Sequence, residues 1–169
     1  MKSLAKKVAF IAFVIFGINS ASAQSVQLLG DFKDWSAFTT SQGVNKLCFV
    51  MSKPKDISPK PDGYDQAYFY ISHRVNENIK NEINFVPGFK LAPNSDATIK
   101  IGSVSHKLFI KENSAWLDDA SKSDELVGQM RAGATLLISA LSSDGTKIVQ
   151  TFSLSGATAA SRAIDRACN

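Results

Sequence analysis

The 169 residues of this chain contain two cysteines, Cys48 and Cys168. Their pairing limits the possible folds of the chain more than any other feature of the sequence. Cys48 lies in an apolar stretch with the pattern of a strand, and Cys168 follows a short segment with the pattern of a helix. If the two are joined, that helix is tied to an early strand and the chain between them forms one closed loop. In the chain-entropy model such a link stabilises a fold by up to ~4–5 kcal/mol.

Residues 1–23 have the pattern of a secretory signal. Three lysines accompany an apolar run over residues 8–18 that is too short to span a bilayer, and small residues at positions 21 and 23 predict cleavage between Ala23 and Gln24. An uncleaved membrane anchor is the alternative, which the early polar end of the apolar run disfavours. We therefore expect residues 24–169 to form a single domain, periplasmic or secreted, without a transmembrane segment.

Export changes how charge and cysteines are interpreted. Removing the three lysines of residues 1–23 lowers the formal net charge from +4 to +1. Nucleic-acid binding is not predicted, because it needs a clustered positive surface. In an oxidising compartment two cysteines favour a disulfide over a metal site, which would need more ligands. We predict a Cys48–Cys168 disulfide, and two buried free thiols are the alternative.

Alternation of apolar and polar residues predicts a series of short strands. The turn-like segment 27–34 precedes the first strand, and the segment 53–65, with three prolines, is predicted to be a solvated loop without strand pairing. The expected strands cover residues 35–39, 46–52, 66–75, 82–86, 97–101, 107–111, 135–141 and 147–152.

Two segments have the pattern of helices. The first is expected to begin with Ser121 or Ser123 as its cap and to stop at Gly133. The second is expected to begin with Ser155 as its cap and to present a narrow, alanine-rich apolar face. Seven or eight short strands with two helices predict a mainly-β fold, an antiparallel β-sandwich with one short interior helix and a C-terminal helix.

Candidate catalytic and metal-binding residues are few. His73 and His106 have no second ligand at a recognisable spacing, so neither a metal site nor a cofactor is predicted. Asp118 and Asp119 follow Trp116, and paired carboxylates near a tryptophan suit acid–base chemistry in a small envelope hydrolase. The simpler interpretation, which we favour, is that Trp116 fills the core and the aspartates precede a helix. No enzyme is predicted.

Three tyrosines lie beside the proline- and lysine-rich loop. Tyr64, Tyr68 and Tyr70 are candidates for an interaction surface, because tyrosine is common where proteins recognise partners. The alternative is that they cover one face of a sheet and decorate a mobile loop.

Several short motifs occur in a characteristic order along residues 24–169. They are Asp34-Trp35, Cys48 within a strand, Val86-Pro87-Gly88, Trp116-Leu117-Asp118-Asp119, Met130-Arg131-Ala132-Gly133, and the segment from Ser153 to Ala160 followed by Cys168. In this order the chain resembles the invasion-associated locus B family of exported bacterial proteins. The chain departs from the better-known pattern in having two cysteines only, with none closely following Trp35.

The resemblance implies a periplasmic or cell-envelope β-sandwich protein of a Gram-negative bacterium. Secretion, a complete-looking core and the lack of a catalytic motif lead to our main hypothesis, a non-enzymatic binding module for a protein or another envelope component. A secreted or surface factor for host invasion or adhesion is one alternative. The other is a small envelope hydrolase that uses Asp118 or Asp119 with a histidine brought near by folding.

Overall fold

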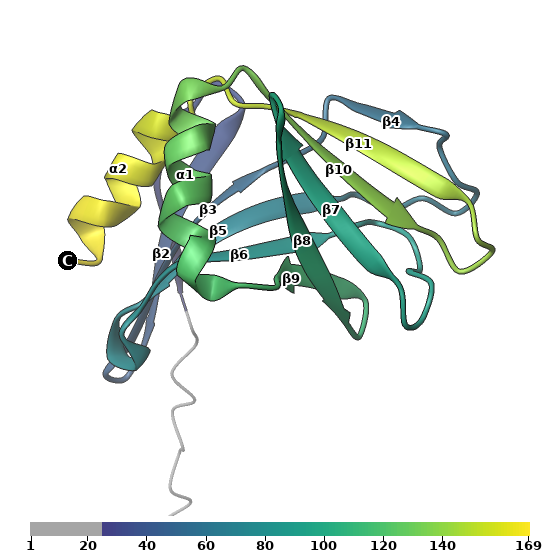
Figure 1. Ribbon diagram of the computed structural model, residues 1–169. Coiled ribbons are helices and arrows are strands. Elements are labelled where there is room, and N and C mark those ends of the chain that lie inside the picture. Colours follow the sequence, from purple (N-terminus) through teal and green to yellow (C-terminus); the bar gives the residue numbers. More distant parts are fainter. Residues whose placement is uncertain (1–24) are drawn as a thin grey trace, which may run out of the picture.

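The computed structural model describes residues 25–169, so the predicted cleavage site between Ala23 and Gln24 lies outside the described residues. The described chain forms an antiparallel sheet with two α-helices and two short 3-10 turns (Figure 1). Its strands are β1 (Val26–Phe32), β2 (Trp35–Gln42), β3 (Asn45–Ser52), β4 (Asp56–Ser58), β5 (Tyr68–Arg74), β6 (Ile79–Val86), β7 (Asp96–Ile101), β8 (Val104–Lys111), β9 (Ser114–Leu117), β10 (Thr135–Leu141) and β11 (Lys147–Ser153). Its helical segments are η1 (Val75–Glu77), η2 (Ala120–Lys122), α1 (Ser123–Ala132) and α2 (Ala157–Ala167). The prediction of an antiparallel β-sandwich with an interior helix and a C-terminal helix is confirmed.

The sandwich is built from one continuous sheet that folds over on itself. The strand order is β1-β2-β3-β5-β6-β9-β8-β7-β10-β11-β4. Figure 1 shows the half formed by β1, β2, β3, β5 and β6 facing the half formed by β8, β7, β10, β11 and β4. Aromatic side chains join the two halves in the core. The Phe152 ring of β11 lies 5.9 Å from the Phe69 ring of β5 and 6.2 Å from the Phe85 ring of β6, measured between centroids. All three side chains are fully buried.

The start of β2 and the end of β11 are also held together, although they lie far apart in the sheet. The indole N–H of Trp35 donates to the Ser153 carbonyl at 2.9 Å, and the Asp34 amide donates to the Ser155 carbonyl at 3.2 Å. Trp35 is buried, so its N–H needs a partner within the protein. These bonds bring the two distant parts of the folded sheet into contact.

The two helices close one end of the sandwich. α1 buries Leu126, Val127 and Met130, whereas α2 buries mainly alanines together with Ile164. Small side chains allow α2 to lie close to the sheet, where it contacts β1, β2, β3 and β5. The predicted disulfide is confirmed: Cys48 of β3 is bonded to Cys168, which follows α2, with their Cα atoms 6.0 Å apart.

Three strands were not predicted. The segment 27–34 was expected to be a turn, but most of it belongs to β1, which pairs with β2 through a register shift between Leu28 and Gly30. The loop 53–65 was expected to lack strand pairing, yet β4 pairs with β11. This pairing is possible because the three residues of β4 lie between Pro54 and Pro59 and include no proline. β9 was missed because four residues give little alternation.

Both predicted helix caps are wrong. Ser121 bonds to the Asp119 carboxylate within the turn η2, and α1 begins after Lys122 without a side-chain cap. α2 begins after Gly156, whose φ of 97° lies in the region that favours glycine, and the Ser155 side chain makes no cap bond. Tight turns replace the expected capping side chains at both helix starts.

Gly156 gives a first test of this packing. A Cβ atom at this position would lie 1.8 Å from the Phe32 carbonyl oxygen, so Gly156→Ala must displace backbone between β1 and β2. We expect it to lower the free energy of unfolding by about 1–3 kcal/mol more than backbone strain alone. The measurement is urea denaturation.

Gly43→Ala is the matched control, because Gly43 also has a positive φ, 59°, but has no atom within 4 Å of its ideal Cβ position. The control should show only the strain of a left-handed residue, about 1–2 kcal/mol. Equal losses in the two variants would contradict the packing described at Gly156.

The disulfide gives a second test. Replacing both cysteines with serine should lower the free energy of unfolding by about 2–5 kcal/mol, because the unfolded chain is no longer restrained over a separation of 120 residues. Denaturation of the natural protein with and without a reductant measures the same quantity independently. A reductant that leaves the unfolding midpoint of the natural protein unchanged would show that the bond contributes nothing.

Candidate functional site

Aromatic side chains gather on the outer face of the half that contains β2, β3 and β5. Strand alternation buries one set of residues in the core and directs the other set outward. Phe38 and Phe49 are register partners whose rings stack at 5.1 Å, and Tyr70 lies 6.2 Å from Phe49. Tyr68 lies 5.9 Å from Tyr70. All four side chains are half-buried, so part of each ring reaches solvent.

The same face continues across β6, β9 and β8. Asn84 of β6 is the register partner of Tyr70 on one side and of Trp116 on the other, and Trp116 is paired with Phe109 of β8. Trp116 is half-buried, and Phe109 remains 39% exposed. We call Phe38, Phe49, Tyr70, Trp116 and Phe109 the aromatic row.

The position of Trp116 corrects the sequence interpretation, which placed it in the core. In β9 the buried residues are Ala115 and Leu117, so Trp116 must point to the opposite face. The small residue Ala115 takes the inward position of β9, between β6 and β8. The larger ring is left at the surface, where it is available to a ligand.

The helices leave the aromatic row uncovered. Cys48 is buried on the inner side of β3, and its bond to Cys168 draws the end of α2 to that same side. Figure 1 shows α1 and α2 beside each other on the side of the sheet that faces the other half of the sandwich. The outer face of β2, β3, β5 and β6 therefore has no covering layer among residues 25–169.

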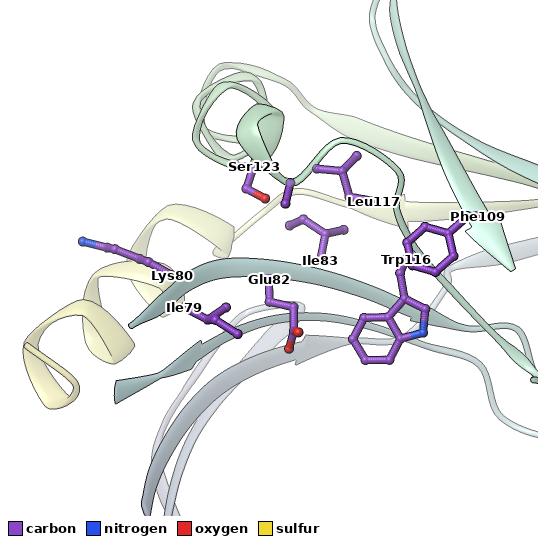
Figure 2. Close-up of a pocket in the computed structure, with 9 residues that line it drawn as sticks. Ile79, Lys80, Glu82, Ile83, Phe109, Trp116, Leu117 and Ser123 are labelled. Atoms are coloured by element: carbon purple, nitrogen blue, oxygen red, sulfur yellow. The ribbon is translucent and has the colours of Figure 1, made fainter. Parts of the chain in front are cut away.

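Two adjoining hollows lie at the end of the aromatic row. One has a volume of about 280 Å³ and the other about 410 Å³, and Glu82, Phe109 and Trp116 line both. The smaller hollow exists because β9 ends at Leu117 while β6 continues back to Ile79, so this stretch of β6 lacks a strand neighbour on that side. Figure 2 shows Glu82 and Trp116 on one side of β6 and Ile83 on the other.

Charges around the hollows are mostly compensated. The Arg74 Nε donates to Glu82 Oε2 at 2.9 Å, and Lys80 Nζ lies 3.6 Å from Asp165 Oδ1. Lys111 and Glu112, which carry opposite charges, both line the larger hollow. The charge of the site is therefore close to neutral.

The predicted tyrosine surface is divided in two. Tyr68 and Tyr70 stand together on the outer face, with Lys53 Nζ 5.7 Å from the centre of the Tyr68 ring. Tyr64 lies against the core instead, and its hydroxyl accepts a hydrogen bond from the Ala67 amide at 3.2 Å. The sequence suggested the tyrosines but missed Phe109 and Glu82. Lys107 and Lys111 lie two residues before and two residues after Phe109, so all three side chains share one face of the strand. The charged lysines indicate that this face, and Phe109 with it, points outward.

Asp118 and Asp119 lie after β9, and both residues are exposed. The Asp119 carboxylate accepts hydrogen bonds from the hydroxyl and amide of Ser121, which lower its pKa. His106 lies near this segment, but its Nε2 is bonded to Gln129 Oε1 at 2.9 Å. Within residues 25–169 neither aspartate carboxylate is hydrogen-bonded to a histidine.

His73 has a structural setting that the sequence did not reveal. It is buried at the inner side of β5, where Nδ1 accepts a hydrogen bond from the Asn81 amide at 3.1 Å. The ring proton therefore lies on Nε2, which donates to Asp165 Oδ1 of α2 at 3.1 Å. His73 thus connects the sheet with α2 close to the disulfide, because Cys48 is its register partner.

Among residues 25–169, no group of three or more histidine, cysteine, aspartate or glutamate side chains is arranged to hold a metal ion. No helix in this part of the chain is long and apolar enough to cross a membrane.

A family model described as "Invasion associated locus B (IalB) protein" matches residues 35–165. The chain belongs to the IalB family. The match includes the strands that carry the aromatic row, all of α1 and most of α2.

A crystal structure of invasion associated protein b from Bartonella henselae has a fold similar to that of this IalB-family chain, with a TM-score of 0.59. The comparison covers 82% of this chain and 96% of that chain, at 14% sequence identity. At this identity the likeness concerns the fold. The comparison with curated proteins gives no match.

Tyr70 gives a third test, based on titration. Burial raises the pKa of its phenol, and the neighbouring Tyr68 raises it further by charge repulsion. The neutral phenol is favoured in the folded state, so its contribution to stability is present below pH ~10 and is lost as pH rises through the folded pKa. Absorbance titration of the folded protein should show one phenol ionising above pH ~10, and Tyr70→Phe should remove that step.

Tyr68→Phe is the control for the second cause. It should leave the late step in place and shift it to lower pH, because the repulsion between the two phenolates is removed. A late step that survives in Tyr70→Phe would assign the shifted pKa to another tyrosine.

Proposed function

We propose that this IalB-family protein is a non-enzymatic binding module that uses the aromatic row to contact a protein or another component of the cell envelope. One observation carries the proposal. The row lies on a sheet face that the rest of the described chain leaves uncovered, while the core on the opposite face is complete without it. Partly exposed aromatic residues in a contiguous group are typical of recognition surfaces, where their rings supply contact area at low entropic cost.

The proposal places the protein in the periplasm or outside the cell. The signal pattern of residues 1–23, with cleavage between Ala23 and Gln24, supports export. The Cys48–Cys168 disulfide also fits an oxidising compartment. Residues 24–169 would then be the mature single-domain protein.

Two features support a non-enzymatic role. Glu82, the carboxylate that lines both hollows, is already engaged by Arg74, whose Nε donates to its Oε2 at 2.9 Å. Asp118 and Asp119 are exposed, and the hydrogen bonds that lower the pKa of Asp119 make it a weaker base. Acid–base catalysis favours the opposite shift for a carboxylic acid near neutral pH.

A second candidate function is a secreted or surface factor that contacts host cells. The observation that favours it is the similarity in fold to invasion associated protein b of Bartonella henselae. The two candidates differ in location. Cell fractionation combined with protease treatment of intact cells separates them, because only a surface-exposed protein is digested.

Site-specific photocrosslinking gives a fourth test. A photoreactive phenylalanine analogue at position 109 should yield covalent adducts with an envelope component in intact cells, because Phe109 belongs to the aromatic row. Val104 is the matched control, since it lies on the same strand and is also 39% exposed, yet has the opposite strand parity. Adducts are resolved by mobility shift and identified by mass spectrometry. Equal adduct yields at the two positions, or none at either, would remove the aromatic row as the binding surface.

A further inference from the structure

The adjoining hollows form a groove with an aromatic ridge. The rings of Trp116 and Phe109 line both hollows, so a ligand that fills one can extend over the rings into the other. Their volumes of about 280 and 410 Å³ are in the range of sites for small molecules and short segments. Figure 2 shows the Phe109 ring beside Trp116, and Ile79 on the same side of β6 as Glu82.

Trp116 differs from the other tryptophan in a way that suits a ligand. Trp35 is 1% exposed and its indole N–H is bonded to Ser153. Trp116 is half-buried, and its N–H has no partner among residues 25–169 and is not buried. It therefore offers a flat ring face together with a hydrogen-bond donor at its edge. A ligand with an apolar face and a polar rim matches this pair of features.

Polar acceptors stand next to the rings. Glu82 Oε2 accepts from Arg74, which fixes the carboxylate and leaves Oε1 as a further acceptor near the hollows. Asn84, between Tyr70 and Trp116 in register, donates from Nδ2 to the Ala115 carbonyl at 3.4 Å. Its side-chain oxygen remains available in the described structure. Fixed acceptors beside an aromatic ring are suited to hydroxyl groups, each of which donates and accepts.

Compensated charge selects against ionic ligands. Glu82 is neutralised by Arg74, Lys80 lies close to Asp165, and the larger hollow is lined by both Lys111 and Glu112. A phosphate group would meet the two carboxylates, and an organic cation would meet the lysines and Arg74. An acyl chain would leave the polar groups of the larger hollow without partners.

We propose that this groove is a saccharide-binding site, in which an uncharged sugar ring stacks on Trp116 and its hydroxyl groups bond to Glu82 in the groove and to Asn84 beside it. Sugar rings present C–H groups on a face and hydroxyls around the edge, and C–H groups are attracted to the negative face of an aromatic ring. The inference rests on the proposed binding function and gives it a ligand class.

Register indicates how a longer chain would lie. Tyr70 and Trp116 are separated by one strand, β6, so the two residues stand two strand spacings apart, about 10 Å. This distance is comparable to the length of a disaccharide unit. A linear oligosaccharide that runs across the strands therefore places one sugar ring at Trp116 and a later one at Tyr70.

Tryptophan fluorescence tests the proposal on the full mature chain. The protein has two tryptophans, and Trp35 is shielded from solvent, so a ligand-induced change reports on Trp116. The probes are uncharged linear tetrasaccharides of glucose and of N-acetylglucosamine. We expect saturable quenching by at least one of them, with a dissociation constant below about 1 mM that changes little with salt concentration.

Variants locate the site by calorimetry, which does not depend on the fluorophore. Phe109→Ala and Trp116→Ala should weaken binding about tenfold or more, and Trp116→Phe, which keeps a ring, should weaken it less. Glu82→Gln keeps the shape of the side chain but makes it a weaker hydrogen-bond acceptor, so it should also weaken binding. Val104→Ala, with the same exposure as Phe109, should bind like the natural protein. Thermal unfolding confirms that each variant is folded.

Three results would overturn the inference. They are no saturable binding of either tetrasaccharide at about 10 mM, equal affinity in Trp116→Ala and Val104→Ala, and an affinity that falls steeply with salt, which would indicate an ionic ligand. Protein adducts at position 109 without sugar binding would retain the proposed function and reject the saccharide. Failure of both experiments would reject both.

Discussion

Phe152 touches Phe69 and Phe85, and this contact between the two halves of one folded sheet supports the rest of the molecule. A sheet that buries one face must find a second layer, and here the second layer is its own continuation. The indole bond from Trp35 to Ser153 secures the same closure at its edge. The helices then need to cover only the open end, which alanine-rich α2 does at close range.

Because the sheet folds over on itself, one face of β5, β6 and β9 is buried and the other is at the surface. The inward residues make the core, whereas no second layer covers the outward residues within the described chain. Trp116 and Ala115 are adjacent in sequence and illustrate the division, because the larger side chain lies outside and the smaller one inside. The aromatic row is thus a feature of the surface and not a part of the core. The arrangement also explains why a groove forms at β9, whose early end leaves part of β6 without a neighbour.

Much of the fold followed from residue patterns, since alternation located β3, β5, β7, β10 and β11, and export chemistry led to the disulfide. The errors have physical causes. Gly30 and Asp31 suggested a turn, but they lie beside a register shift that lets β1 continue along β2. β4 is stabilised by pairing with β11, about ninety residues away, which no local pattern reports. The face on which Trp116 lies was not predictable from a strand of four residues. The groove depends on β6 and β9 meeting, and that is a long-range contact.

The link between Cys48 and Cys168 has a consequence for the order of events during folding. The thiol of Cys48 emerges during synthesis 120 residues before its partner, so the nascent chain carries an unpaired, nucleophilic sulfur for most of that time. Pairing of β4 with β11 must also wait for late segments, which places the chain among slowly folding topologies rich in distant contacts. Until then Cys48 is open to exchange with other thiols and disulfides. Correct formation of the disulfide therefore depends on the thiols and disulfides around the chain as well as on the chain itself.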